Sequence, residues 1–187
     1  ARSRERFVAD EYRGLAYADI AVPIAEAEQM MYPVHEARML QALDVPPDDR
    51  VLEIGTGSGF LTACLAQLGG IVTSYEIHPT LSESAAQRLD ALGLKNIELV
   101  AGDGLHASLA PETFKVVAVT GSLPEQPSFL EDLLAPGGRM FLVVGEAPAM
   151  TAKLVSRNAD GELWRENLFE TVLPALHNAP KPDRFTF

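Results

Sequence analysis

The sequence of 187 residues has little cysteine, little basic charge and no long apolar run. Cys64 is the only cysteine, which excludes a disulfide within the chain and a zinc site built on cysteine ligands. So little cysteine is typical of a reducing compartment, and we expect a cytoplasmic location. No apolar stretch approaches the roughly 20 residues that a membrane span needs, so we expect no membrane partner.

Basic residues are outnumbered by acidic ones. The chain has 15 Lys and Arg against 26 Asp and Glu, which gives a net charge of −11 and a pI near 4.7. Nucleic-acid binding depends on basic side chains that displace counterions from phosphates, so the sequence predicts no nucleic-acid partner. The length and the apolar fraction of 47% indicate a single globular domain over residues 1–187.

Residues 51–145 alternate short apolar runs with amphipathic stretches, a pattern typical of βα units in a mostly parallel sheet. We expect strands at 51–54, 71–77, 97–100, 116–120 and 140–144, and helices near 35–43, 60–68 and 81–92. Two capping boxes are expected, Thr80 with Glu83 and Ser128 with Glu131. After residue 145, runs at 152–155 and 163–173 flank an Asp-Gly turn, so the sheet is expected to end in an antiparallel hairpin.

The strongest signal is a glycine-rich turn after an apolar strand, where residues 51–59 are Val-Leu-Glu-Ile-Gly-Thr-Gly-Ser-Gly. Glycines let a ligand approach the main chain without interference from a Cβ. The spacing is G-x-G-x-G rather than the G-x-G-x-x-G of dinucleotide sites, and Glu53 would repel a pyrophosphate at the following helix. The turn therefore favours a cationic ligand without phosphates, such as S-adenosylmethionine.

Two further acids follow the next two strands. Glu76 ends the second strand, where a carboxylate is able to accept both hydroxyls of a ribose, and Asp103 follows the third strand, where it could bind an adenine amino group. With Glu53 they would line one crevice at the carboxyl ends of the strands. Each has a purely structural alternative: Glu76 as a solvated strand-end acid, and Asp103 as a turn residue that bonds its own backbone.

These residues resemble class I S-adenosylmethionine-dependent methyltransferases and, within them, the protein-L-isoaspartate O-methyltransferases. Residues 51–59 look like that family's cofactor motif almost letter for letter. Further matches extend from the N-terminal to the C-terminal part of the chain, at 4–8, 23–24, 37–39, 102–104, 119–120, 124–125, 136–138 and 173–174.

The resemblance implies a Rossmann-like α/β fold, with a mostly parallel seven-stranded sheet flanked by helices. It implies S-adenosylmethionine as cofactor and methyl transfer to a carboxylate of an isoaspartyl-containing protein or peptide. Residues 1–50 would form a substrate-side segment, 51–145 the cofactor-binding core, and 146–187 the hairpin and tail. In the implied cofactor site, Glu76 holds the ribose and Asp103 the adenine, and the other members are Glu53, Gly55, Thr56, Gly57, Ser58, Gly59, Ile77 and Gly104.

One segment departs from the family pattern. Where the family usually has Gln-Thr-Ile-Ser, this chain has Glu28-Gln-Met-Met31, so the hydroxyls of the acceptor site are absent at Gln29 and Met31. By position, Gln29, Met31 and Thr120 are the expected catalytic residues. Two hypotheses remain open: the altered pocket takes a different, more apolar group, or backbone N–H groups hold the usual carboxylate.

An ionised carboxylate is already a nucleophile, so the missing Ser-His-Asp or Cys-His arrangement counts neither for nor against methyl transfer. Two alternatives to the isoaspartyl activity remain: a related methyltransferase with a small molecule or modified peptide as acceptor, and a catalytically weak protein that only binds the donor.

A metal site is not expected. His35-Glu36 starts like a zinc-protease helix but has Met39 at the second ligand position, and His78, His106 and His177 have no His or Cys nearby in sequence.

Overall fold

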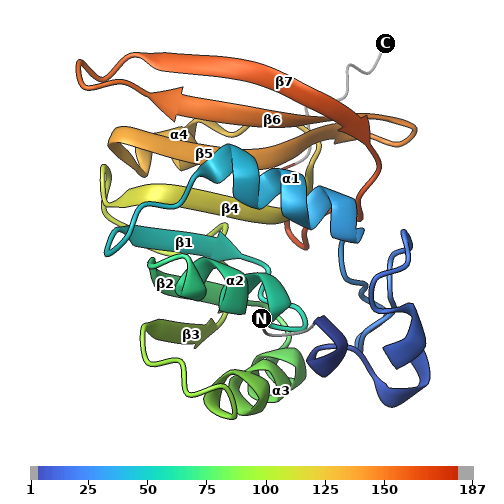
Figure 1. The fold of residues 1–187 in the computed structure, drawn as a ribbon. Helices are drawn as coiled ribbons and strands as arrows, with labels where there is room; N and C mark the ends of the chain where they lie inside the picture. Colours follow the sequence, from blue (N-terminus) through green and yellow to red (C-terminus); the bar gives the residue numbers. More distant parts are fainter. Residues whose placement is uncertain (1–3, 181–187) are drawn as a thin grey trace.

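The computed structural model describes residues 4–180, which form one sheet of seven strands with helices on both faces (Figure 1). The strands are β1 (Arg50–Ile54), β2 (Ile71–Glu76), β3 (Ile97–Ala101), β4 (Phe114–Leu123), β5 (Leu134–Glu146), β6 (Ala149–Arg157) and β7 (Leu163–Thr171). The helices are α1 (Pro33–Leu43), α2 (Phe60–Gln67), α3 (Pro79–Asp90) and α4 (Ser128–Asp132), preceded by two 3-10 turns, η1 (Arg4–Arg6) and η2 (Asp10–Leu15).

The sheet has the order β3-β2-β1-β4-β5-β6-β7. The first five strands in this order run parallel to one another, and β6 runs antiparallel to both of its neighbours, β5 and β7. The predicted fold class, a mostly parallel sheet of seven strands that ends in an antiparallel hairpin, is confirmed. The strand order reverses between β1 and β4, where the chain leaves β1 toward β2 and returns to pair β4 on the other side. Open α/β sheets bind ligands at such a reversal, outside the carboxyl ends of the strands.

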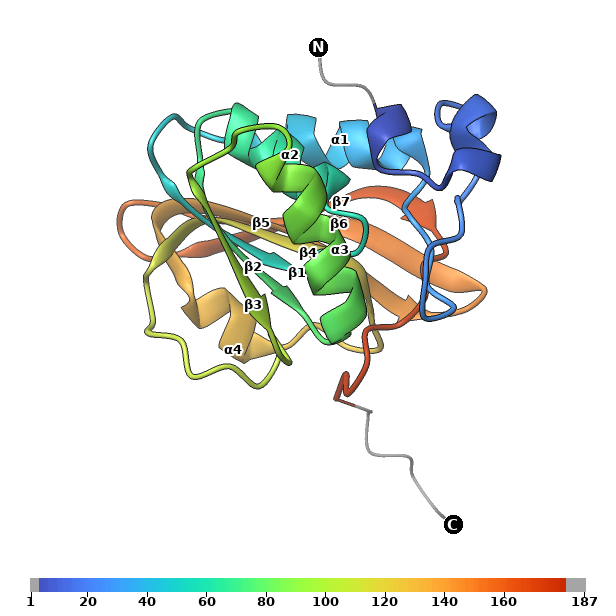
Figure 2. The same cartoon turned by 90° about the horizontal axis from the view of Figure 1, so that it is seen from below.

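Two apolar layers cover the two faces of the sheet, and Figure 2 shows the helices on opposite sides of it. One layer packs Met39 of α1 and Leu65 of α2 against Val51 and other side chains of the sheet. The opposite layer packs Leu130 of α4 against Leu52 and its neighbours. Val51 and Leu52 face opposite layers because successive side chains of a strand alternate between faces.

The predicted capping boxes do not form. Pro79 and Pro127 decide both helix starts: α3 begins at Pro79 after His78 as N-cap, and α4 follows Pro127 as N-cap, without a side-chain cap in either helix. Pro79 suits the first helical position of α3 because its missing N–H would have no partner there. Pro127 takes the N-cap position of α4, which leaves Ser128 as the first helical residue. Thr80 is the second residue of α3, two positions beyond the N-cap, and its hydroxyl donates to Glu26 instead.

Within residues 4–180, no helix is both long and apolar enough to cross a membrane.

Candidate active site

The glycine loop between β1 and α2 requires glycine at its first position. Gly55 has a φ of +100°, and a Cβ at this residue would lie 2.1 Å from the Thr120 hydroxyl oxygen. That hydroxyl donates to the carbonyl oxygens of Ile54 and Gly55, at 2.9 and 2.8 Å. Thr120 therefore joins β4 to the end of β1 at the point where the strand order reverses.

A cleft opens beside this loop, at the carboxyl ends of the central strands. Its empty volume is about 700 Å³, which includes space open to solvent. The structure brings eight of the predicted site residues to its wall: Gln29, Gly55, Gly57, Glu76, Ile77, Asp103, Gly104 and Thr120. The C-terminal segment forms another part of the wall through residues 174–177.

Glu76 is held at the base of this cleft by the main chain. Its Oε2 accepts the N–H of Gly57 at 2.7 Å, and its Oε1 accepts the N–H of His78 at 3.0 Å. The side chain is buried, yet each carboxylate oxygen has a second lone pair. Glu76 is thus both oriented and able to accept two hydroxyl groups from a ligand.

Asp103 lies in the turn that follows β3 and is bonded on both oxygens. Oδ1 accepts the N–H of Leu105, and Oδ2 accepts His106 Nδ1 and Asn178 Nδ2, all at 2.9 Å. Partial burial raises the pKa of Asp103, but hydrogen bonds from these three donors outweigh it and hold the pKa below the ordinary value. Asp103 therefore bonds the backbone of its own turn, as the structural alternative predicts, and it also lies in the wall of the cleft.

Glu53 does not share this cleft, contrary to the prediction. Like Val51, it lies on the β1 face that packs against α2, because side chains two residues apart share a face. Its Oε2 accepts the hydroxyls of Thr62 and Ser74, at 2.5 and 2.6 Å, while Oε1 is buried without a hydrogen-bond partner. Burial raises the pKa of Glu53 to about 7, although the two hydroxyls oppose this rise.

This buried carboxyl predicts a pH-dependent stability. The pKa of Glu53 is higher in the folded chain than its ordinary value of 4.5. The contribution of this carboxyl group to the free energy of unfolding is therefore fully present below pH 4.5 and is lost as the pH rises through about 7. At 1.36 kcal/mol per pKa unit, this is on the order of 3 kcal/mol. Urea unfolding measures how far the free energy of unfolding falls from pH 5 to pH 8. We expect this fall to be about 2 kcal/mol smaller in Glu53→Gln than in the wild type.

The matched control is Glu98→Gln, because Glu98 is exposed on β3. It should keep the wild-type difference in unfolding free energy between the two pH values. The interpretation of Glu53 is contradicted if Glu53→Gln keeps that difference too.

A second cavity of about 380 Å³ adjoins the cleft. The structure places all three expected catalytic residues, Gln29, Met31 and Thr120, in its wall. Gln29 and Thr120 also line the first cleft, together with Gly55 and Gly57, so the two spaces meet at these residues. Met31 is buried and belongs to the apolar layer under α1 and α2, so the cavity wall and the hydrophobic core share this side chain.

The remaining residues of the predicted cofactor loop are bonded within the protein. The hydroxyl of Thr56 lies 2.6 Å from that of Ser74, and the Ser58 hydroxyl accepts the N–H of Phe60 at 3.3 Å. Both side chains are buried and line the second cavity rather than the first. Gly59 is the N-cap residue of α2.

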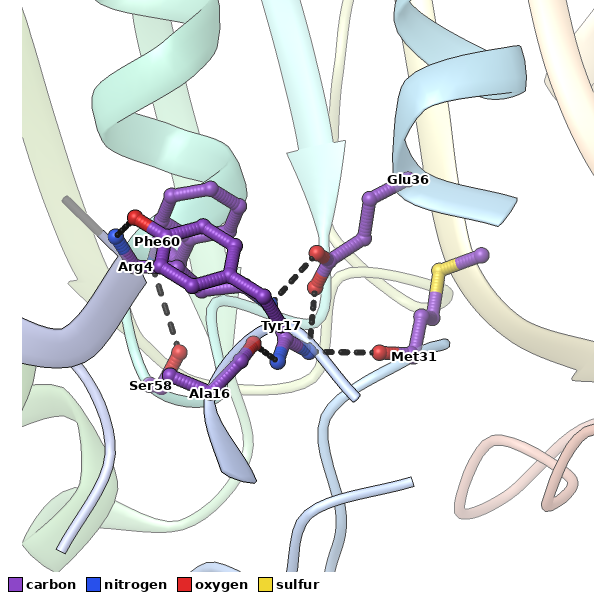
Figure 3. Close-up of polar contacts among 7 residues, drawn as sticks. All are labelled: Arg4, Ala16, Tyr17, Met31, Glu36, Ser58 and Phe60. Atoms are coloured by element: carbon purple, nitrogen blue, oxygen red, sulfur yellow. Dashed lines mark hydrogen bonds and ion pairs between the residues drawn. The ribbon is translucent and has the colours of Figure 1, made fainter. Parts of the chain in front are cut away.

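A buried ion pair of Arg4 and Glu36 lies beside the second cavity, with Glu36 in its wall (Figure 3). Sequence reasoning missed this pair. Arg4 Nε lies 2.8 Å from Glu36 Oε2, and one Arg4 Nη donates to the Met31 carbonyl at 2.7 Å. The other Nη donates to the Ala16 carbonyl at 2.5 Å. Burial raises the pKa of Glu36 to about 7, although Arg4 opposes this rise.

The sheet order and the cleft beside the glycine loop define the fold of a class I methyltransferase. The chain belongs to the protein-L-isoaspartate O-methyltransferase family. The family model for protein-L-isoaspartate(D-aspartate) O-methyltransferase matches residues 1–178.

Two curated relatives agree with this assignment, and two solved structures share the fold. A protein-L-isoaspartate O-methyltransferase of Anaeromyxobacter dehalogenans is 44% identical over 96% of this chain and 88% of the relative. One of Koribacter versatilis is 39% identical over 88% and 74% of the two chains. A Plasmodium falciparum structure of the same description, in complex with S-adenosyl-L-homocysteine, has a TM-score of 0.76 at 21% identity and covers 92% of this chain and 85% of its own. Another protein-L-isoaspartate O-methyltransferase structure has a TM-score of 0.81 at 26% identity and covers 95% and 59%.

Proposed function

We propose that this protein transfers a methyl group from S-adenosylmethionine to the free carboxylate at an isoaspartyl bond of a protein or peptide. The observation that carries the proposal is the junction of the two cavities at Gly55, Gly57 and Thr120. The first cleft has the carboxylates of Glu76 and Asp103 in its wall, and the second cavity offers an approach for a second substrate to the same point. Membership of the family supplies the acceptor class.

The residues of the first cleft fit S-adenosylmethionine. A Cβ at Gly104 would lie 2.9 Å from the Cβ of Tyr75, so glycine allows the turn after β3 to pack closely on β2 in this part of the cleft wall. Glu76 and Asp103 present carboxylate oxygens there, and among residues 4–180 no lysine or arginine lines the cleft for a phosphate. Glu76 would hold the ribose hydroxyls and Asp103 the adenine amino group.

When bound, the donor supplies a methyl group on a positively charged sulfur. Displacement at that carbon by a carboxylate is an in-line reaction, so the protein contributes mainly by orienting the nucleophile. The acceptor carboxylate needs hydrogen-bond donors, because an unpaired carboxylate in an apolar cavity costs several kcal/mol. The Thr120 hydroxyl is already committed to main-chain carbonyls. Gln29 is exposed in the second cavity, and its carboxamide offers two N–H donors. We assign to Gln29 the role of holding the acceptor.

Gln29→Leu tests this assignment. A hydrogen bond to a charged group contributes about 1.5–3 kcal/mol, so the KM for an isoaspartyl peptide is expected to rise roughly 10- to 100-fold. The affinity for S-adenosylhomocysteine, measured by calorimetry, should change much less. Gln67→Leu, at the exposed end of α2, is the matched control. An unchanged KM in Gln29→Leu would show that backbone N–H groups hold the carboxylate instead.

We further propose that the described chain acts as one catalytic domain in the cytoplasm. A single sheet contains strands of the core and of the C-terminal hairpin, which supports one domain. The single cysteine supports the location.

A further inference from the structure

Three side chains from distant parts of the sequence converge at the mouth of the first cleft. They are Glu28 in the loop before α1, His78 at the start of α3, and His177 in the segment after β7. The ligand atoms of the three residues all lie within 4.8 Å of one another. His78 and His177 are 99 residues apart in sequence, and Glu28 and His177 are 149 apart.

From these three side chains, we propose a binding site for a divalent transition-metal ion, with Zn²⁺ as the best match. The Glu28 Oε1 atom lies 3.0 Å from His177 Nε2 and 3.7 Å from His78 Nε2, and the two Nε2 atoms are 3.4 Å apart. Zinc binds imidazole nitrogen and carboxylate oxygen at about 2.0–2.1 Å in a tetrahedron, which places neighbouring ligand atoms about 3.3 Å apart. The three atoms thus have the spacing of one tetrahedral face.

Hydrogen bonding alone accounts poorly for this arrangement. A neutral imidazole Nε2 either donates one hydrogen or accepts one. If His177 donates to Glu28, its Nε2 has no lone pair for His78, which lies 3.4 Å away. The 3.7 Å between His78 Nε2 and Glu28 Oε1 is too long for a hydrogen bond. A cation at the centre would satisfy all three atoms at once.

The main chain around each ligand is already fixed. The N–H of Glu28 donates to the Ala25 carbonyl, and its own carbonyl accepts the N–H of Ile24. The N–H of His78 donates to Glu76, and residue 176, next to His177, donates to the Ser122 carbonyl. Ligands held in place before binding lose little freedom when the metal arrives. Two histidines and one carboxylate favour zinc over magnesium or calcium, which prefer oxygen ligands.

The site would leave a fourth metal position for water and would connect three segments that form the cleft wall. Bound metal would therefore join the loop before α1 to the segment after β7 across the cleft mouth. This proposal does not depend on the methyltransferase activity, because it rests only on the three ligands.

The test is a titration of the untagged, metal-free protein with Zn²⁺ in competition with a chromophoric chelator. We expect one ion per chain, and at least about 10-fold weaker binding in His78→Ala and in His177→Gln, since even loss of an outer partner of a metal site costs 10- to 100-fold. His106→Ala is the matched control, because His106 pairs with Asp103 at 2.9 Å but lies in no cluster of three ligands among residues 4–180. It should bind Zn²⁺ like the wild type.

Two readouts separate coordination from a general loss of structure. Circular dichroism should show that each variant is folded. Co²⁺ in place of Zn²⁺ should give the visible absorption of a tetrahedral site in the wild type and in His106→Ala, but not in His78→Ala or His177→Gln. The proposal is overturned if the wild type binds Zn²⁺ no more tightly than His177→Gln, or if His106→Ala weakens binding equally.

Discussion

Glu76→Ala is expected to weaken the binding of S-adenosylhomocysteine at least about 100-fold. The substitution removes the buried carboxylate that would accept the ribose hydroxyls, and a hydrogen bond to a charged group contributes about 1.5–3 kcal/mol. It also frees the N–H groups of Gly57 and His78, which Glu76 now orients. Calorimetric titration of the folded variant with S-adenosylhomocysteine measures the effect directly.

Glu83→Ala is the matched control, because Glu83 is exposed on α3 and lies outside the wall of the cleft. It should bind the nucleoside like the wild type. Wild-type affinity in Glu76→Ala would contradict a role of Glu76 in cofactor binding and would favour a purely structural role for this strand-end acid.

Arg4→Ala is expected to destabilise the protein by about 3–5 kcal/mol, the usual cost of removing one partner from a buried ion pair. Glu36 would remain buried without the guanidinium that now bonds it at 2.8 Å. For a chain of this length the loss corresponds to a fall in Tm of roughly 10 °C. The penalty should be smaller at pH 5 than at pH 8, because the buried Glu36 is able to take up a proton at the lower pH.

Thermal unfolding followed by circular dichroism measures this loss. Arg6→Ala, an exposed arginine in the same 3-10 turn, is the control and should stay near the wild-type Tm. The double variant Arg4→Met with Glu36→Leu should recover much of the stability, since an apolar pair leaves no buried charge. An Arg4→Ala protein as stable as Arg6→Ala would contradict the role given to the ion pair.

The sheet was largely predictable because its strands carry local patterns. The apolar run at 51–54, the glycine turn after it and the Asp-Gly turn at 160–161 each depend on adjacent residues, and each lies where it was expected. The face of Glu53 was predictable too. Strand alternation places its side chain on the same face of β1 as that of Val51, which packs against α2. The prediction instead grouped Glu53 with Glu76 and Asp103 because all three acids lie near strand ends.

The parts that escaped prediction depend on distance in sequence. Arg4 and Glu36 are 32 residues apart, and the RERFV segment at 4–8 was noted only as a match to the family. His78 and His177 meet only because the segment after β7 returns to the carboxyl ends of the parallel strands. No local periodicity in the sequence indicates that these two side chains meet.

A paired-peptide assay is the most direct test of methyl transfer to an isoaspartyl carboxylate by this protein. Two peptides identical except for an isoaspartyl or a normal aspartyl linkage are incubated with the protein and S-adenosylmethionine labelled in its methyl group. We expect label in a base-labile ester on the isoaspartyl peptide only, with S-adenosylhomocysteine as an inhibitor. Tight binding of S-adenosylhomocysteine without transfer to the isoaspartyl peptide would contradict the proposed function.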